Sequence, residues 1–394
     1  MGYDIETSVL ERYEEGAREH QPTLCCPTEY DGRYLTIIPD EIIAKDYGCG
    51  DPTRYINEGE TVLDLGSGAG KNCYIIAQKV GANGQVIGVD FNDEMLTLAR
   101  KYQGEIADKI GCANTKFVKG KIQDLKLPLD PVEAWLKENP ITDLASLKEW
   151  EIEVDRLKKE ETLIPDNSVD VVVSNCVLNL VKPEDKKELF AEIFRVLKKG
   201  GRAVISDIVC DEDLPQEILD DADLWSGCLA GAFREDLFLE MFVEAGFYGV
   251  EILVREPEPW QVIKGIEFRS LTVRAYKGKE GECLERNQAV VYKGPWKQVQ
   301  DDDGHVYYRG QRMAVCDKTF NILTNETSPY HDSVIGIAPL TEVAIEDATE
   351  FACKSSAIRS AKETKGDVYG EDIIITNESS CCSPSETDSS SSCC

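Results

Sequence analysis

The chain has 394 residues, enough for two modest domains or for one large domain with an appendage. Lys and Arg number 43 against 73 Asp and Glu, and the formal charge of -30 repels nucleic acid and anionic membrane surfaces alike. No apolar run reaches the roughly 18 residues that cross a bilayer, and the first residues lack the basic and apolar regions of a signal peptide. We therefore expect a cytoplasmic monomer with no nucleic-acid partner and no membrane partner.

Cysteine is unusually frequent, with 15 residues against three histidines, His20, His305 and His331. A large acidic chain without a signal peptide is expected to keep its thiols reduced, so some of them should bind a soft ligand. The histidines are too few and too scattered for a zinc cluster or a histidine charge relay, and no C-x-x-C pair is present.

Residues 1–60 are interpreted as an N-terminal cap and substrate-binding segment. Apolar and aromatic positions in residues 1–20 predict a short amphipathic helix. The pair Cys25-Cys26 follows, and then Cys49, which is flanked by glycines in a predicted turn before the first apolar strand. Those glycines favour an approachable sulfur at Cys49 over a small buried packing residue.

An apolar strand within residues 61–73 stops at Asp64 and opens into a loop with glycines at every second position, Gly66, Gly68 and Gly70. Glycine leaves the amides unhindered and permits positive φ, so we expect this backbone to approach a ligand. The spacing is G-x-G-x-G, which differs from the dinucleotide pattern G-x-G-x-x-G. A second apolar strand ends at Asp90, which is placed to accept hydrogen bonds from ribose hydroxyls. Loop, acid and following helix together favour a nucleoside cofactor over a simple glycine turn.

Strands and helices alternate from Thr61 to about Gly249, which predicts an α/β, doubly wound, Rossmann-like sheet over residues 61–257 with ligands at the carboxyl ends of its strands. Strands are expected at 61–65, 85–90, 115–118, 169–174 and 202–208, and helices at 71–80, 93–102, 184–198 and 234–245. The third strand leads to Ile122 and Gln123, our candidates for contact with adenine. An insertion at 126–165 is expected to be a solvated helical face without a catalytic role.

Two further cysteines stand at the expected reaction edge of this sheet. The fourth strand runs directly into Asn175 and Cys176, and Cys228 lies next to glycine and an aromatic residue after the fifth strand and its loop. Free cysteine is often a buried packing residue, but Cys49, Cys176 and Cys228 come from three connections that this topology brings to one crevice.

The pattern changes after about residue 257. Alternating segments at 266–275, 288–292 and 310–316 predict a small, mainly β C-terminal domain over 260–345. Residues 346–394 are interpreted as a mostly disordered tail, rich in Ser and Cys. The pairs Cys381-Cys382 and Cys393-Cys394 in this tail would suit capture and transfer of a thiophilic ion.

The sequence resembles the arsenite S-adenosylmethionine methyltransferases, which have a class I methyltransferase fold. The resemblance covers most of residues 20–320, and its motifs are Tyr47-Gly-Cys49-Gly, Leu63-Asp-Leu-Gly-Ser-Gly-Ala-Gly-Lys-Asn-Cys73-Tyr, Val172-Val-Ser-Asn-Cys176-Val-Leu-Asn-Leu-Val and Leu224-Trp-Ser-Gly-Cys228-Leu-Ala-Gly-Ala. The glycine loop alone is generic, whereas the three cysteine contexts together are specific.

The resemblance implies methyl transfer from S-adenosylmethionine to trivalent arsenic held by Cys49, Cys176 and Cys228, with Cys25 or Cys26 as a substrate shuttle. It implies a thiol reductant such as glutathione or thioredoxin. The cofactor residues expected from sequence are Asp64, Gly66, Gly68, Gly70, Asp90, Ile122, Gln123 and Asn175. Alternatives are a methyltransferase for another thiol, selenium or tellurium compound, and a metalloid-binding protein without catalysis.

Overall fold

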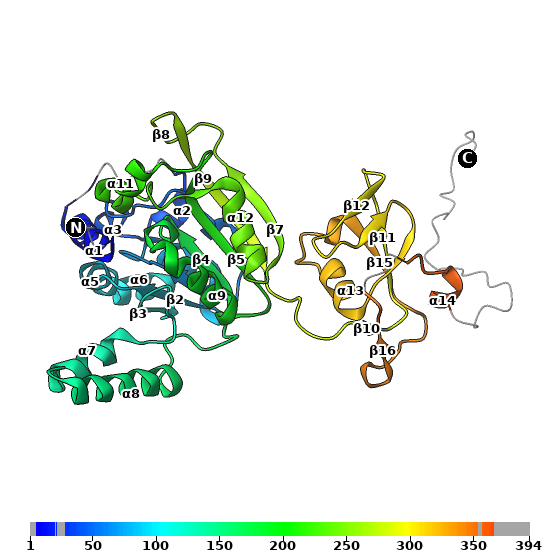
Figure 1. Cartoon of the computed structure of the whole chain (residues 1–394), viewed down its shortest axis with the longest axis horizontal. Coiled ribbons are helices and arrows are strands. Elements are labelled where there is room, and N and C mark those ends of the chain that lie inside the picture. Colours follow the sequence, from blue (N-terminus) through cyan, green and yellow to red (C-terminus); the bar gives the residue numbers. More distant parts are fainter. Residues whose placement is uncertain (1–4, 20, 22–27, 354–356, 366–394) are drawn as a thin grey trace, which may run out of the picture. The chain divides into compact units, whose positions relative to one another are not determined.

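The computed structural model describes residues 5–19, 21, 28–353 and 357–365 (Figure 1). The chain divides into two compact units, Met1–Glu280 and Gly281–Cys394. Each unit has its own sheets and its own apolar core.

The first unit is built on one large sheet, which has nine strands within the described residues; seven of them follow the order β3-β2-β1-β4-β5-β9-β7. The parallel strands are β1 (Thr61–Leu65), β2 (Gln85–Asp90), β3 (Thr115–Lys119), β4 (Val169–Asn175) and β5 (Leu197–Cys210). The antiparallel end consists of β9 (Ile266–Tyr276), β7 (Tyr248–Arg255) and the short strand β8 (Gln261–Ile263), which pairs with β9. The short strand β6 (Phe233–Arg234) pairs in parallel with β5.

Helices cover both faces of this sheet, because successive residues of a strand point to opposite faces. In β1, Val62 packs in one apolar cluster and Leu63 and Leu65 pack in another. The first cluster includes α4 (Lys71–Val80), α5 (Asp93–Lys101) and α6 (Gln103–Ile110), and the second includes α9 (Lys186–Val196) and α12 (Glu235–Glu244). The predicted doubly wound α/β fold is therefore confirmed.

The order of the strands reverses at β1, whose two neighbours are β2 and β4. In an open α/β sheet, ligands bind beside the carboxyl ends of the strands at this reversal. Residues that follow β1, β2 and β4 are therefore brought to one crevice.

The helical insertion has the expected character. It forms α7 (Leu129–Glu138) and α8 (Leu144–Glu160), and α8 is largely exposed apart from Leu157. The rings of Trp135 and Trp150 lie 5.7 Å apart and join the two helices.

Helices α1 (Ile5–Arg18), α10 (Gln216–Leu219) and α11 (Ala222–Ser226) contribute to a third apolar cluster of this unit. The short helices α2 (Gly32–Leu35) and α3 (Asp40–Ile43) pack in the cluster that includes α4. α1, drawn in dark blue, lies against α11 (Figure 1), and Arg12 of α1 donates to the carbonyl of Asp223 at 2.7 Å and to the hydroxyl of Ser226 at 2.8 Å. The amphipathic helix predicted within residues 1–20 is thus present as a cap.

The boundary predicted at about residue 260 is wrong. β9, which we assigned to the C-terminal domain, pairs with β5 from Phe268 to Tyr276 and with β7 on its other side, so it belongs to the large sheet. Its alternating pattern identified a strand, but a pattern within one strand does not specify its partners. The first unit consequently ends at Glu280.

The second unit contains small sheets and two described α-helices. β10 (Leu284–Glu285) pairs with β16 (Thr349–Glu350), β11 (Ala289–Tyr292) lies between β14 (Arg312–Ala314) and β15 (Val334–Ile337), and β12 (Gln298–Gln300) pairs with β13 (Val306–Tyr308). The helices are α13 (Asp317–Thr324) and α14 (Ala361–Lys365). β16 and α14 fall within the predicted tail of 346–394, so ordered structure extends further than we expected. The four tail cysteines from Cys381 onward lie outside the described residues.

Candidate functional site

Cys49 lies on a tight loop that precedes β1 and is held by the side chain of Asn175. The amide oxygen of Asn175 accepts from the backbone N–H of Cys49 at 2.9 Å and from that of Gly50 at 3.1 Å. The approach is so close that a Cβ on Gly48 would lie 2.2 Å from Nδ2 of Asn175, and one on Gly50 would lie 2.7 Å from Ser206. The glycines on either side of Cys49 therefore allow the loop to sit directly on the ends of β4 and β5.

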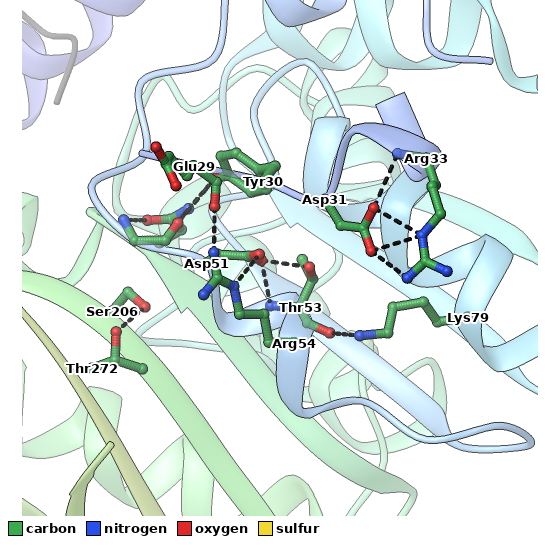
Figure 2. A network of polar contacts seen from close by, with 12 residues as sticks. Glu29, Tyr30, Asp31, Arg33, Asp51, Thr53, Arg54, Lys79, Ser206 and Thr272 are labelled. Atoms are coloured by element: carbon green, nitrogen blue, oxygen red, sulfur yellow. Dashed lines mark hydrogen bonds and ion pairs between the residues drawn. The ribbon is translucent and has the colours of Figure 1, made fainter. Parts of the chain in front are cut away.

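Polar contacts fix the segment that directly follows Cys49 (Figure 2). Tyr30 donates to the carbonyl of Gly50 at 2.9 Å and accepts from Nδ2 of Asn175 at 2.9 Å. Asp51 accepts from the N–H of Thr53 at 3.1 Å and pairs with Arg54 at 3.0 Å, which starts a short 3₁₀ turn, Pro52–Tyr55. Few degrees of freedom remain for the Cys49 backbone.

Cys176 and Cys228 share an uncommon backbone conformation, with φ of 64° at each. Cys176 directly follows β4, and its N–H donates to the carbonyl of Ser206 at 2.8 Å. Cys228 follows α11, where its N–H donates to the carbonyl of Trp225 at 3.0 Å. A residue with a Cβ in the left-handed region loses roughly 1–2 kcal/mol, and such conformations concentrate at functional sites.

The three cysteines predicted from sequence lie in one buried apolar cluster together with Val9, Trp225 and Phe268. The sulfurs of Cys49 and Cys176 and a carboxylate oxygen of Asp207 all lie within 4.8 Å of one another. The thiol of Cys228 donates to the carbonyl of Cys176 at 3.1 Å. The structure thus brings the three residues together. The sulfur of Cys228 lies against the backbone carbonyl of Cys176.

Asp207 is a residue of this cluster that sequence reasoning missed. It is fully buried on β5, and its carboxylate accepts from the N–H of Leu178 at 2.9 Å and from its neighbour Ile208 at 2.8 Å. Burial raises the pKa of Asp207 to about 7, although these hydrogen bonds act in the opposite direction. The one indication of Asp207 in the sequence was that it is an acid near the carboxyl end of a predicted strand.

A cavity of about 120 Å³ extends from the cysteine cluster over the ends of β1 and β2. Six of the predicted cofactor residues line it, namely Gly66, Gly68, Asp90, Ile122, Gln123 and Asn175, and Cys176 lines it as well. Asp90 accepts from the N–H of Gly68 at 2.8 Å and from that of Asn92 at 2.9 Å. The cysteine cluster and the cavity therefore share a wall at Cys176.

The glycine loop fits a ligand that approaches its backbone. Gly68 has φ of 51°, and a Cβ there would meet no protein atom within 4 Å because the residue borders the cavity. A Cβ on Gly66 would lie 2.4 Å from Val177. Open space above Gly68 and the nearby carboxylate of Asp90 suit a nucleoside with its ribose at Asp90.

Two predicted cofactor residues, Asp64 and Gly70, are not among the residues that line the cavity. Asp64 is buried and accepts a hydrogen bond from the thiol of Cys73 at 3.2 Å, and burial raises its pKa to about 7. Gly70 precedes α4 with φ of 89°, and a Cβ there would lie 2.9 Å from Phe117. Both residues shape the loop from the side away from the cavity, and Cys73 is buried there.

Most hydrogen bonds of the Asn175 side chain are with the Cys49 loop. Besides the contacts above, its Nδ2 donates to the carbonyl of Gly50 at 2.8 Å. We expected Asn175 at the cofactor, and it does border the cavity. Its hydrogen bonds indicate that it also positions Cys49.

Helix α1, which the sequence predicted only as a cap, forms one wall of the cavity. Glu6, Val9 and Tyr13 line the cavity, and the hydroxyl of Tyr13 lies 3.7 Å from the sulfur of Cys228. Burial, followed by the charges of Cys228 and Cys176, raises the pKa of Tyr13. The predicted shuttle residues Cys25 and Cys26, which follow α1 in the chain, lie outside the described residues.

This fold and cavity are those of a class I S-adenosylmethionine-dependent methyltransferase, and residues 56–164 and 137–246 match the methyltransferase domain family. An arsenite methyltransferase from Aquipseudomonas alcaligenes is 32% identical over 316 residues, which cover 77% of this chain and 80% of that protein. The human arsenite methyltransferase is 30% identical over 303 residues, covering 74% and 71%. The chain belongs to the arsenite methyltransferase family.

A solved structure gives the same relationship. An arsenic(III) S-adenosylmethionine methyltransferase from Chlamydomonas reinhardtii is 27% identical, with a TM-score of 0.54, and the match covers 83% of this chain and all of that one. Residues 279–369 match a domain of unknown function (DUF8838). None of the described helices is both long and apolar enough to span a bilayer.

Proposed function

We propose that this enzyme transfers a methyl group to trivalent arsenic that is bound by Cys49, Cys176 and Cys228. The observation that carries the proposal is the shared wall: Cys176 belongs to the cysteine cluster and also lines the cofactor cavity. The arsenite methyltransferases of the comparison support the choice of substrate.

Trivalent arsenic is soft and forms three bonds, so three thiols can replace its hydroxyl groups. The hydroxyls leave as water with the thiol protons, and the arsenic lone pair remains as the nucleophile. Because this nucleophile carries no proton, the methyl transfer needs no general base, in agreement with the scarcity of histidine in the sequence.

S-adenosylmethionine supplies an electrophilic methyl group. Gly66, Gly68 and Asp90 would hold its nucleoside, and the residues around Cys176 would orient arsenic towards it. Holding two reactants in line can supply roughly 7–11 kcal/mol. The buried apolar surroundings of the cysteines also exclude water from the arsenic.

We further propose that the enzyme acts as a cytoplasmic monomer in arsenic detoxification, with glutathione or thioredoxin as reductant. Thiols at Cys49, Cys176 and Cys228 must stay reduced to bind arsenic, which favours a reducing compartment. Cys25 or Cys26 would deliver the substrate. The charge of -30 argues against nucleic acid and anionic membranes as partners.

Replacing a proposed ligand should separate catalysis from cofactor binding. Cys176→Ser and Cys228→Ser should each reduce arsenite methylation to background while calorimetry still detects S-adenosylmethionine binding. Cys112→Ser is the matched control, because Cys112 is a half-exposed cysteine outside the cluster. Normal turnover in either ligand variant contradicts the assignment, and arsenite binding by the wild type without formation of S-adenosylhomocysteine would indicate sequestration instead.

Asp90→Ala tests the cofactor side of the site. Loss of a carboxylate that would bind ribose should weaken S-adenosylmethionine binding by about tenfold or more. Arsenite binding, measured without the cofactor, should be nearly unchanged. An unaltered cofactor affinity would exclude the ribose role.

A further inference from the structure

A second group of three thiols lies in the other unit of the chain. The sulfurs of Cys283, Cys316 and Cys353 are all within 4.8 Å of one another. The three residues are far apart in sequence and come from three different segments: Cys283 precedes β10, Cys316 precedes α13 and Cys353 follows β16.

Backbone pairing explains how two of these segments meet. β10 and β16 are antiparallel, with Leu284 opposite Glu350. Beyond the strands, the N–H of Phe351 donates to the carbonyl of Cys283 at 2.8 Å, and the N–H of Cys353 donates to the carbonyl of Phe351 at 2.9 Å. This tight turn brings Cys353 back towards Cys283.

Cys316 enters the group from the N-terminus of α13. Its sulfur accepts from the N–H of Thr319 at 3.4 Å and lies 3.2 Å from the hydroxyl of the same residue. Cys316 is therefore held in place by its own helix.

Apolar packing does not account for the three cysteines. The core of this unit consists of Val290, Tyr292, Tyr307, Met313, Val315 and Leu323, and none of the three thiols belongs to it. Cys283 and Cys353 are half-buried and Cys316 is buried. The group is thus accessible from solvent on one side and supported by protein on the other.

A positive charge, that of Lys318, lies beside the group. Lys318 is held nearby, since its Nζ donates to the carbonyl of Gly281 at 2.9 Å.

The described residues place three sulfurs in this group and no fourth ligand of the His, Asp or Glu type. His305 contacts the backbone of Cys353 and has both ring nitrogens engaged, Nδ1 with Asp301 at 2.9 Å and Nε2 with the carbonyl of Cys353 at 2.7 Å. Structural zinc sites almost always have four ligands. Three thiols match a trivalent ion, because three thiolates neutralise its charge without a fourth ligand.

We propose that Cys283, Cys316 and Cys353 form a second binding site for trivalent arsenic. The identity of the ion rests on the proposed function, because the sulfurs alone specify only a soft ion that takes three sulfur ligands. Binding is a ligand exchange: three As–S bonds replace three As–O bonds, and each hydroxyl leaves as water with one thiol proton. The oxidation state of arsenic does not change, and no reductant is consumed.

The test uses the full-length chain with Cys176→Ser as background, so that methylation and the first site are removed. Arsenite is added under a phosphine reductant, and bound arsenic is counted by mass spectrometry of the metal content and characterised by X-ray absorption. The background variant should retain arsenic with three sulfur neighbours. Adding Cys353→Ser should weaken binding by about tenfold or more, whereas adding the control Cys112→Ser should leave it unchanged.

Equal arsenic binding with and without Cys353 overturns the proposal, since other cysteines of the chain would then hold the ion. Cys283→Ser provides an independent variant that spares the N-terminus of α13, and near-ultraviolet circular dichroism verifies that the unit remains folded. Stoichiometric zinc in the wild type that disappears with Cys353→Ser would also overturn the proposal in favour of a structural zinc. Failure of the wild type to methylate arsenite would refute the proposed function while leaving these binding results interpretable.

Discussion

Cys176 and Cys228 hold a left-handed backbone conformation that residues other than glycine and asparagine rarely adopt. Each sits where the chain changes direction, one after β4 and one after α11. The conformation aims two side chains from distant segments into the same apolar cluster. We infer that the surrounding packing, including Trp225 and Phe268, maintains a geometry that the local sequence disfavours.

Asp64 offers a prediction about pH. Burial raises its pKa to about 7, so the folded chain binds the proton more tightly than the unfolded chain does. The free energy of unfolding should therefore fall as pH rises from about 4 to about 7, by about 4 kcal/mol at most at about 1.4 kcal/mol per pKa unit. Below this window the full stability is present.

Thermal unfolding between about pH 5 and about pH 8 measures this effect. Asp64→Asn retains an oxygen for the thiol of Cys73 and removes the titrating group, so its stability should decline less with pH than that of the wild type. Asp236→Asn is the control, since the pKa of that exposed carboxyl is lowered to about 2 through its hydrogen bonds with Arg234. Parallel pH profiles for the wild type and Asp64→Asn would refute the prediction.

For individual residues, the sequence indicated which side chains belong to the site better than it indicated their contacts. Cys49, Cys176 and Cys228 stand next to glycine or at the end of an apolar strand, which made them visible. Asp207 was missed because its position at the end of a predicted strand did not by itself indicate that it lies buried beside the sulfurs of Cys49 and Cys176. Asn175 was assigned to the cofactor alone, since its bonds to a loop about 125 residues earlier are not encoded in local pattern.

The Cys49 loop is the element on which the proposed site depends most directly. It carries one ligand, and it lies against residues from β4 and β5, so its backbone position decides whether Cys49 reaches the other sulfurs. Glycine at position 48 is required by that close approach.

Gly48→Ala should displace the loop, because the new Cβ would lie 2.2 Å from Nδ2 of Asn175. A shift of about 1 Å at a reacting group can reduce the rate by about 100-fold, and we expect a loss of arsenite methylation of that order. The measurement is steady-state turnover, accompanied by thermal unfolding to establish that the fold persists. Gly32→Ala is the control, since no atom lies within 4 Å of its added Cβ; similar rates for the two variants would argue against the loop's role.

Elements with strong local periodicity were predicted well. β1, β2 and α4 have the expected bounds, and α5 and α9 differ by a few residues at their ends. The short strands β6 and β8 were not predicted, because two or three residues carry no periodic signal. β7 was not predicted either. Among the strands described, it pairs only with β9.

At the scale of the whole molecule, β9 determines where the first unit ends. It contributes a strand between β5 and β7, with pairs that run from Arg202 opposite Tyr276 to Cys210 opposite Phe268. The apolar residues Leu271 and Val273 of this strand are fully buried in the main core.

Two truncations test this boundary. A fragment of residues 1–280 keeps the complete sheet, and it should unfold cooperatively and bind S-adenosylmethionine. A fragment of residues 1–257 lacks β9, which leaves the edge of β5 unpaired and its core contacts missing, so it should aggregate or fail to fold. Circular dichroism, size-exclusion chromatography and calorimetry distinguish the two, and a stable, cofactor-binding 1–257 fragment would show that β9 is dispensable.

Because β9 lies near the end of the first unit, its position also affects how this unit folds during synthesis. Residues 202–210 leave the ribosome well before residues 266–276, their partner on that side, have been translated. During that interval a largely apolar edge is available to neighbouring nascent chains. When Tyr276 emerges from the exit tunnel, the first residues of the second unit already occupy the tunnel behind it. The sheet of the first unit is therefore completed while the second unit is being synthesised.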